Sequence, residues 1–425
     1  MRILASKNRR AIDALCARDV ARDPAVAATA ARIVSDVRQR GDTGLRHWMK
    51  RLDGVEPPFE ITAAELRKGW SDTPRDVRRA IRVAAKNIRR VALRQLPKPF
   101  VVSVGPGVQI EQRVAALSSV GCYVPGGRYP LPSTLLMTVI PAGVAGVPDI
   151  VVACPKPAPA VLCAALEAGA SRVLRIGGAQ AIAALAYGTR SISRVDKIVG
   201  PGNAWVAAAK TLVSADCAID FQAGPSEIVV CSDAGPADWI AADLLAQAEH
   251  DPAARAIFIT TRRTLAEDVA RHVQAQMPAT GPAAAAIAAN GAIVVARTRK
   301  DATDLVNRIA PEHLVCDRPE DVRRFEAAGT IFVGAWSAQA SGDYCTGSNH
   351  VLPTGGAARF RGGLSAADFV RAYTVQTLSR RGLDAIGPSV VALAAAEGLT
   401  AHARSVAVRL AHDRARPPVR SGRPR

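Results

Sequence analysis

The chain has 425 residues, of which 49% are hydrophobic and 4% aromatic, and its formal net charge is +18. This length allows two or more domains with their own cores, and the composition excludes a disordered chain and favours an α/β enzyme. Much of the positive charge lies in residues 75–98 and 404–425. Nucleic-acid binding would explain such stretches, but no aromatic residues alternate with the bases, so a solvated basic face is favoured. We therefore expect no nucleic-acid partner.

The cysteines and the apolar segments bear on the compartment. The eight cysteines are scattered and form no C-x-x-C pair, which is typical of a reducing compartment rather than of a disulfide framework or a cysteine-type zinc site. The N-terminus lacks the apolar core of a signal peptide. The longest uncharged run, residues 129–148, contains four prolines and does not suit a membrane span. We expect a soluble, cytoplasmic protein without a membrane partner.

The predicted elements begin with helices. Apolar residues at three- and four-residue spacing indicate helices over residues 11–15, 25–37 and 77–93. Between residues 100 and 114 the period shortens toward two, which predicts strand on both sides of the turn Gly105-Pro106-Gly107.

Strand and helix then alternate from about residue 118. Apolar strand-like runs occupy residues 114–120, 150–154, 173–176 and 197–199, and helical patterns occupy 133–145, 158–168, 181–187 and 204–214. This alternation predicts a parallel sheet with helices on both faces. Glycine-containing turns at 121–127, 177–178 and 200–202 follow three of the strands. Glycine there would let backbone N–H groups approach a phosphate, but none of the turns is a G-x-G-x-x-G fingerprint and plain turns are the alternative.

A second alternating block follows. Its strands are predicted over residues 228–231, 256–260, 292–295 and 330–333, and its helices near 239–250, 265–277 and 302–309. Residues 278–290 suit either a loop or the start of a helix. Helical spacing returns over residues 366–375 and 388–397, and the Arg/Pro-rich stretch from about residue 414 is expected to be disordered.

These patterns predict an α/β fold of two doubly wound, incomplete Rossmann-like domains, one inserted in the other, with a helical C-terminal tail. Residues 21–117 and 226–365 are assigned to one domain, residues 118–225 to the inserted domain and residues 366–425 to the tail. Residues 1–20 are expected to pack with the tail.

Three polar clusters carry candidate chemistry. Gln247 and His250 would share one face of a helix, and an imidazole nitrogen beside an amide oxygen can bind a metal. Glu312 and His313 follow a proline, and Asp343 lies in a Ser-Gly-Asp-Tyr sequence. Each cluster also has a plainer explanation from its pattern: a surface pair, a helix start and a turn residue.

The chain resembles the histidinol dehydrogenase family from about residue 20 to residue 410. The motifs that carry the resemblance are Tyr-Val-Pro-Gly-Gly at 123–127, Gly-Gly-Ala-Gln-Ala at 177–181, Val-Asp-Lys-Ile-Val-Gly-Pro-Gly-Asn at 195–203, Ala-Gly-Pro-Ser-Glu at 223–227, Ala-Gln-Ala-Glu-His-Asp at 246–251, Ala-Pro-Glu-His-Leu at 310–314, Gly-Asp-Tyr at 342–344, Asn-His-Val-Leu-Pro-Thr at 349–354 and Glu-Gly-Leu-Thr-Ala-His at 397–402.

The resemblance implies a zinc-containing, NAD-dependent alcohol and aldehyde dehydrogenase. It would oxidise L-histidinol to L-histidine through L-histidinal with two NAD⁺, at the end of histidine biosynthesis. By position, the zinc ligands would be Gln247, His250, Asp343 and His402, and the acid–base pair would be Glu312 and His313. Ser226 and Glu397 would hold substrate together with those six residues. Tyr123, Gln180 and Asn203 would line the NAD site.

The resemblance also implies a homodimer with shared active sites. The tail of one subunit would complete the partner's site, so that Glu397 and His402 would act across the dimer. Residues 118–225 would bind NAD, and residues 21–117 with 226–365 would bind zinc and substrate. Cys122 and Cys345 lie near site motifs and are expected to be spectators. The alternatives are a related enzyme acting on another polyol or amino alcohol, and a basic nucleic-acid-binding protein that keeps only the fold.

Overall fold

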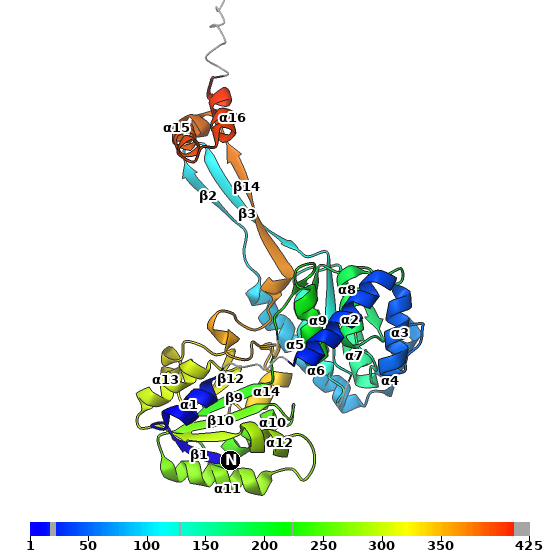
Figure 1. Ribbon diagram of the computed structural model, residues 1–425, viewed down its shortest axis with the longest axis vertical. Coiled ribbons are helices and arrows are strands. Elements are labelled where there is room, and N and C mark those ends of the chain that lie inside the picture. Colours follow the sequence, from blue (N-terminus) through cyan, green and yellow to red (C-terminus); the bar gives the residue numbers. More distant parts are fainter. Residues whose placement is uncertain (18–22, 127–128, 223, 412–425) are drawn as a thin grey trace, which may run out of the picture. The chain divides into compact units, whose positions relative to one another are not determined.

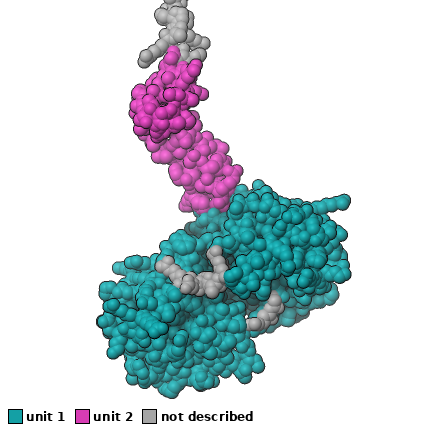
Figure 2. Space-filling view, in the orientation of Figure 1, with its two compact units in different colours: residues 1–96, 116–369 teal, residues 97–115, 370–425 magenta. Residues whose placement is uncertain are grey.

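The structure, a computed structural model, describes residues 1–17, 23–126, 129–222 and 224–411. It divides into two compact units (Figure 2): unit 1 comprises Met1–Leu96 and Ala116–Phe369, and unit 2 comprises Pro97–Ala115 and Val370–Arg425. No helix in the described ranges is long and apolar enough to cross a membrane. Parallel sheets with helices on their faces confirm the predicted α/β class.

Unit 1 contains a five-stranded parallel sheet with strand order β6-β5-β4-β7-β8. Its strands are β4 (Ser119–Tyr123), β5 (Asp149–Ala153), β6 (Arg172–Leu174), β7 (Lys197–Val199) and β8 (Ala218–Ile219). The helices between them are α6 (Pro132–Val144), α7 (Pro159–Ala168), α8 (Gly178–Tyr187) and α9 (Ala204–Val213). These helices are apolar nearly all round because further helices cover their outer faces.

The covering helices come from the N-terminal part of the chain. They are α2 (Pro24–Arg40), α3 (Asp42–Asp53), α4 (Ala63–Asp72) and α5 (Arg75–Gln95). Helix α2 packs on α8 and α9, α4 packs on α7, and α5 packs on α6. This packing differs from the predicted grouping of residues 21–117 with residues 226–365. The division into a host and an inserted domain stays a prediction, because both sheets belong to one compact unit.

Unit 1 also contains a six-stranded parallel sheet with strand order β1-β11-β10-β9-β12-β13 (Figure 1). Its strands are β1 (Arg2–Ala5), β9 (Glu227–Cys231), β10 (Arg255–Thr260), β11 (Ala292–Val295), β12 (His313–Cys316) and β13 (Thr330–Val333). Helices α10 (Ala237–Ala248), α11 (Arg263–Gln276) and α12 (Ala283–Asn290) cover one face, and α1 (Arg9–Cys16) and α13 (Arg299–Ile309) cover the other. The short helix α14 (Gln339–Tyr344) follows β13.

Both sheets have a topological switch point, where the strand order reverses. In the five-stranded sheet β5 and β7 lie on either side of β4, and in the six-stranded sheet β10 and β12 lie on either side of β9. Ligands of open α/β sheets usually bind outside the carboxyl ends of the strands at such a point. The two switch points are therefore the first places to look for a dinucleotide.

Unit 2 combines a three-stranded sheet with two helices. The strands are β2 (Phe100–Gly105), β3 (Val108–Ala116) and β14 (Val370–Leu378), in the order β14-β3-β2, and the helices are α15 (Arg380–Ala396) and α16 (Thr400–Ala411). The predicted hairpin around Gly105-Pro106-Gly107 and the helical tail are confirmed. The predicted helix over residues 366–375 is wrong, because only Ala366–Phe369 is helical and a strand rich in β-branched residues follows.

Candidate active site

Glu312 and His313 lie where the chain leaves helix α13 and enters strand β12. Ala310 ends the helix in a left-handed conformation, with φ at 54°, and the chain runs from Pro311 into the sheet. Neither residue begins a helix, which removes one of the plainer explanations for this pair. Both side chains are buried, with only 5% and 3% of their surfaces exposed.

One residue of the neighbouring strand holds both side chains. The backbone N–H of Glu227 on β9 donates to Oε2 of Glu312 over 2.8 Å, and Nδ1 of His313 lies 3.4 Å from the backbone oxygen of Glu227. When Nδ1 carries the imidazole proton it donates to this carbonyl group, and Nε2 is then a free acceptor. Phe332 of β13 stacks beside the imidazole with ring centroids 6.1 Å apart.

Asp343 of α14 connects His313 to His250. Its Oδ1 lies 3.6 Å from Nε2 of His313, and its Oδ2 lies 3.8 Å from Nε2 of His250. His250 follows the end of α10 and donates its backbone N–H to the carbonyl oxygen of Gln247. The structure thus brings together residues from three of the predicted motifs, although His250 lies beyond the helix and not within it.

The charges of this cluster are strongly coupled. Burial raises the pKa of Glu312 to about 7, although His313 and the Glu227 N–H oppose the shift. Burial lowers the pKa of His313, but the carboxylates of Glu312 and Asp343 outweigh it and the net shift is upward. Asp343 shows the reverse balance: burial would raise its pKa, and the two imidazoles bring it well below its usual value. Asp343 is therefore the permanent anion, and Glu312 titrates near neutral pH.

The donor set suits a divalent cation. Within the described ranges no three His, Cys, Asp or Glu side chains form a metal cluster by themselves. Gln247, however, is fully buried, and neither its amide oxygen nor its amide nitrogen has a hydrogen-bond partner in the described part of the chain. Such an orphaned group costs about 1–3 kcal/mol. An oxygen ligand of this kind next to His250 and Asp343 is consistent with zinc coordination.

The other predicted substrate residues lie in two places. Ser226 immediately precedes β9, adjacent in sequence to Glu227, and its carbonyl oxygen accepts the N–H of Arg255. Glu397 caps the end of α15, and His402 lies on α16; both are exposed residues of unit 2. Six of the eight predicted substrate residues therefore belong to unit 1 and two to unit 2.

The three predicted cofactor residues lie at the switch point of the five-stranded sheet or on the helices that begin there. The hydroxyl group of Tyr123, at the end of β4, accepts the N–H of Gly178 over 3.1 Å. Gln180 is fully buried and donates to Oδ2 of Asp53 over 2.9 Å, while its amide oxygen has no partner among the described residues. Asn203 is exposed and caps the N-terminus of α9.

A buried ion pair fixes the turn that follows β7. Lys210 and Asp220 are 3% and 1% exposed and form an ion pair. The ammonium group also donates to the carbonyl oxygen of Gly200, and the carboxylate accepts the N–H of Gly200, over 2.9 and 2.8 Å. Gly200 has φ at 112°, and a Cβ there would overlap the carbonyl oxygen of Tyr123. The glycine turn after β7 is therefore locked against the end of β4.

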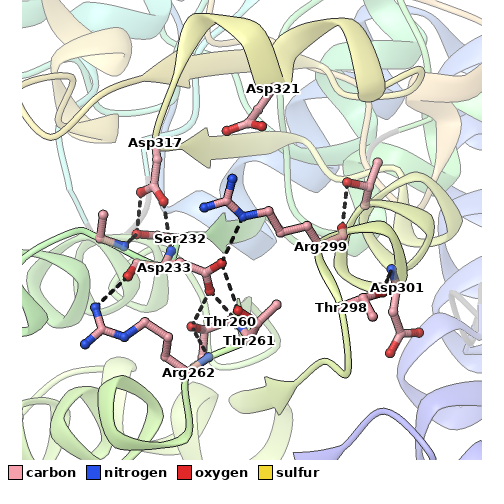
Figure 3. A network of polar contacts seen from close by, with 12 residues as sticks. Ser232, Asp233, Thr260, Thr261, Arg262, Thr298, Arg299, Asp301, Asp317 and Asp321 are labelled. Carbon is pink, nitrogen blue, oxygen red and sulfur yellow. Dashed lines mark hydrogen bonds and ion pairs between the residues drawn. The ribbon is translucent and has the colours of Figure 1, made fainter.

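The corresponding switch point of the six-stranded sheet is filled by its own side chains (Figure 3). The carboxylate of Asp233 accepts hydrogen bonds from the hydroxyl groups of Thr260 and Thr261 and lies 3.6 Å from Nε of Arg299. The carboxylate of Asp317 accepts hydrogen bonds from the hydroxyl group of Ser232 and from the backbone N–H of Asp233. A cavity of about 30 Å³ remains beside them, which is room for a water molecule or two. The polar side chains at this switch point are thus bonded to one another.

A further, half-buried histidine, to which the sequence assigned no ligand role, lies beside the site. His350 places Nδ1 2.8 Å from the carbonyl oxygen of Asp343 and Nε2 3.2 Å from the hydroxyl oxygen of Thr134 on α6. Burial lowers its pKa, so the neutral form is favoured. The signal was its place in the matched Asn-His-Val-Leu-Pro motif, seven residues after Asp343.

Comparison with known proteins settles the family. The family model described as histidinol dehydrogenase matches residues 16–410. The chain belongs to the histidinol dehydrogenase family. The matched range includes every residue that the motifs singled out, from Tyr123 to His402.

Individual relatives agree with this assignment. The histidinol dehydrogenase of Caulobacter vibrioides is 47% identical over 397 residues, which cover 91% of this chain and 92% of that protein. The histidinol dehydrogenase of Agrobacterium fabrum is 45% identical, with 92% and 94% coverage. The crystal structure of histidinol dehydrogenase from Elizabethkingia anophelis superposes with a TM-score of 0.92 at 31% identity, covering 98% of this chain and 99% of that one. The predicted resemblance to the histidinol dehydrogenase family is confirmed.

Proposed function

We propose that the protein is a zinc-dependent histidinol dehydrogenase that oxidises L-histidinol to L-histidine through L-histidinal with two NAD⁺. The observation that carries the proposal is the chain of contacts from His250 through Asp343 to His313, with Glu312 buried beside it. Membership of the family supplies the substrate, and the buried acid–base groups support the chemistry.

Zinc would be held by Gln247, His250, Asp343 and His402. Two imidazoles, a carboxylate and an amide oxygen leave room in the coordination shell for substrate. When bound, zinc orients the amine and imidazole of the substrate and polarises the reacting oxygen. The orphaned amide of Gln247 supports this assignment, because a cation would give its oxygen a partner.

His313 is the proposed base for the alcohol. The carbonyl oxygen of Glu227 favours the proton on Nδ1, which leaves Nε2 to accept the hydroxyl proton of the substrate. NAD⁺, when bound, would supply the acceptor for the hydride lost from the carbon that bears this hydroxyl group. Asp343, 3.6 Å from Nε2, stabilises the imidazolium that results. The acid–base pair therefore needs no rearrangement to take the first proton.

Glu312 is the proposed activator of water in the second oxidation. An aldehyde must add water before it can lose a second hydride, and a carboxylate can accept the proton of that water. The pKa of about 7 makes Glu312 a stronger base than an ordinary carboxylate. Its anchor on the Glu227 N–H keeps one carboxylate oxygen fixed, and the proposal assigns the proton of the water to the other.

NAD⁺ is proposed to bind at the switch point of the five-stranded sheet, near Tyr123, Gln180 and Asn203. The locked glycine turn and the N-terminus of α9 lie at this switch point, and the positive end of the helix dipole would favour a phosphate there. The hydrogen bonds among the side chains at the switch point of the six-stranded sheet support this choice.

A homodimer with shared sites is proposed from unit 2. Glu397 and His402 would serve the active site of the partner. Unit 2 exposes a set of large apolar side chains, which a partner subunit would cover: Phe100, Val101, Val102, Val104, Leu378, Ile386, Val390, Leu393, Leu399 and Val408.

The direct test measures metal and product together. The purified protein is expected to contain one zinc per chain and to form two NADH for each L-histidinol consumed. With L-histidinal supplied instead, one NADH is expected, because only the second oxidation remains. An amino alcohol without an imidazole serves as the control for specificity. A protein that carries no stoichiometric zinc, or that reduces no NAD⁺ with L-histidinol, would contradict the proposal.

The pH dependence follows from Glu312. Its raised pKa means that the carboxylate is lost at higher pH than usual, so kcat/KM for L-histidinal should fall as the pH drops below about 7. A cation bound to Asp343 would lower this pKa and move the acidic limb downward. Glu312→Gln, which has no ionisable group, should be slow at every pH and should lack this limb. The same limb surviving in Glu312→Gln would assign it to another group.

Subunit sharing can be tested by mixing inactive variants. His313→Ala and His402→Ala should each be nearly inactive. After subunit exchange, each heterodimer should contain one site with both residues intact, and about a quarter of the normal activity should return for random pairing, since half of the dimers then have one working site of two. No recovery despite proven exchange would mean that the tail serves its own chain.

A further inference from the structure

We propose that Gln339 is a positioning residue, which fixes the carboxylate of Asp343 and, together with Asp243, ties helix α14 to helix α10. This inference rests on the proposed zinc site and names two residues outside the proposed ligand set. Gln339 acts on a proposed ligand through a hydrogen bond, Asp243 acts through Gln339, and neither is itself a proposed ligand.

The contact between Gln339 and Asp343 is short and buried. Gln339 is the first residue of α14, is fully buried, and donates from Nε2 to Oδ2 of Asp343 over 2.8 Å. The two histidines lie 3.6 and 3.8 Å from the same carboxylate. Of these three contacts, the one from Gln339 is the closest and therefore constrains the carboxylate most.

The amide at position 339 also lacks its full set of partners. Its Oε1 has no hydrogen-bond partner among the residues that the structure describes. A buried amide that leaves one acceptor unsatisfied is poorly explained by stability alone, since an apolar side chain of the same size would avoid the cost. The cost is understandable if the donor half of the amide is needed at Asp343.

Asp243 fixes the other end of Gln339. Its carboxylate accepts the backbone N–H of Gln339, at a helix start where Ala338 supplies no side-chain cap. Asp243 lies one turn before Gln247 on α10, so the same helix carries this anchor and a proposed zinc ligand. The position of Gln247 relative to Asp343 is therefore set through Gln339.

The other side of α14 is packed too closely to move toward the sheet. A Cβ on Gly342 would overlap the ring of Phe332, the residue that stacks on His313. Removing the amide of Gln339 should accordingly leave the helix in place and free the Asp343 carboxylate to rotate. The expected defect is in metal binding and not in folding.

The test compares two glutamines, Gln339 and Gln276, each of which is hydrogen-bonded to a residue of α10. Gln339→Met keeps the volume and removes the donor. Gln276→Met is the control for the same change at an exposed position, because Gln276 on α11 donates to the carbonyl oxygen of Asp238 on α10. Zn²⁺ affinity is measured on the full-length metal-free protein by competition with a chelator, and the visible spectrum of the Co²⁺-loaded protein is recorded.

Gln339→Met should weaken Zn²⁺ binding by about 10–100-fold, the range typical for residues that hydrogen-bond to metal ligands, and should shift the Co²⁺ spectrum. Gln276→Met should change neither. Asp243→Asn keeps an acceptor for the Gln339 N–H and should bind Zn²⁺ nearly normally, whereas Asp243→Ala should be weakened.

Unchanged Zn²⁺ affinity and an unchanged Co²⁺ spectrum in folded Gln339→Met would overturn the inference while leaving the proposed function intact. Equal Zn²⁺ affinities of Asp243→Asn and Asp243→Ala would show that Asp243 has no part in positioning Gln339. If the unsubstituted protein bound no Zn²⁺, the inference and the proposed function would fall together. A thermal melt of each variant separates loss of metal from loss of fold.

Discussion

Replacing His313 with glutamine is expected to reduce kcat for L-histidinol by about a thousandfold, within the range for a lost general base. The glutamine amide can still donate to the carbonyl oxygen of Glu227, but it cannot accept and hold a proton as Nε2 does. The KM for L-histidinol should change little, because the proposed zinc ligands are untouched. Steady-state kinetics with a measured zinc content tests both expectations.

His272→Gln is the matched control for this substitution. His272 lies on α11 and belongs to none of the matched motifs, so its replacement should leave kcat within about twofold of normal. A loss of less than tenfold in His313→Gln, with zinc still bound, would assign the first proton transfer to a different group. A loss of zinc in His313→Gln would instead make His313 part of the metal site.

Replacing Lys210 with methionine should destabilise the fold by about 3–5 kcal/mol, the usual cost of removing one partner of a buried ion pair. Asp220 would keep its hydrogen bonds from the N–H groups of Gly200 and Phe221 but would lose its counter-ion in the protein interior. Since the same pair fixes the turn after β7, the KM for NAD⁺ should rise as well. Urea denaturation and NAD⁺ kinetics at a temperature where the variant is folded measure the two effects.

Lys68→Met provides the comparison. Lys68 forms an ion pair with Asp72 one helical turn away, and the two side chains are 74% and 44% exposed. Exposed pairs of this kind contribute about 0–1 kcal/mol, so this variant should be close to normal in both assays. If Lys210→Met were as stable as Lys68→Met, the buried pair would not be what holds the turn.

The alternating parts of the fold could be predicted because their signal is local. Strands β7, β11 and β13 begin and end where the pattern placed them, since each is a short apolar run between helical patterns. The strands that were missed depend on distant partners. β1 pairs with β11, nearly 290 residues further along the chain, and β14 pairs with the hairpin of residues 100–116. A window of local sequence contains no trace of such partners.

The sequence could predict only those parts of the site that consist of side chains. Motifs identified His250, His313 and Asp343, and the structure brings these together. The support given by Glu227 acts through its backbone N–H and carbonyl groups, which no side-chain pattern encodes. The proposed role of Gln339 could not be predicted from the sequence either, because it depends on a hydrogen bond and on burial, and residue identity alone predicts neither.

The hydrogen-bonded network of Asp233 and Asp317 at the switch point of the six-stranded sheet has a kinetic consequence for the proposed reaction. The proposal places NAD⁺ only at the other switch point, so each subunit would carry out two oxidations with one cofactor site. After the first oxidation, NADH has to dissociate and a second NAD⁺ has to bind while the intermediate L-histidinal remains in the active site. In the proposed reaction the intermediate would therefore have to dissociate more slowly than the cofactor is exchanged, and its retention by the proposed zinc ligands would be as important as either hydride transfer.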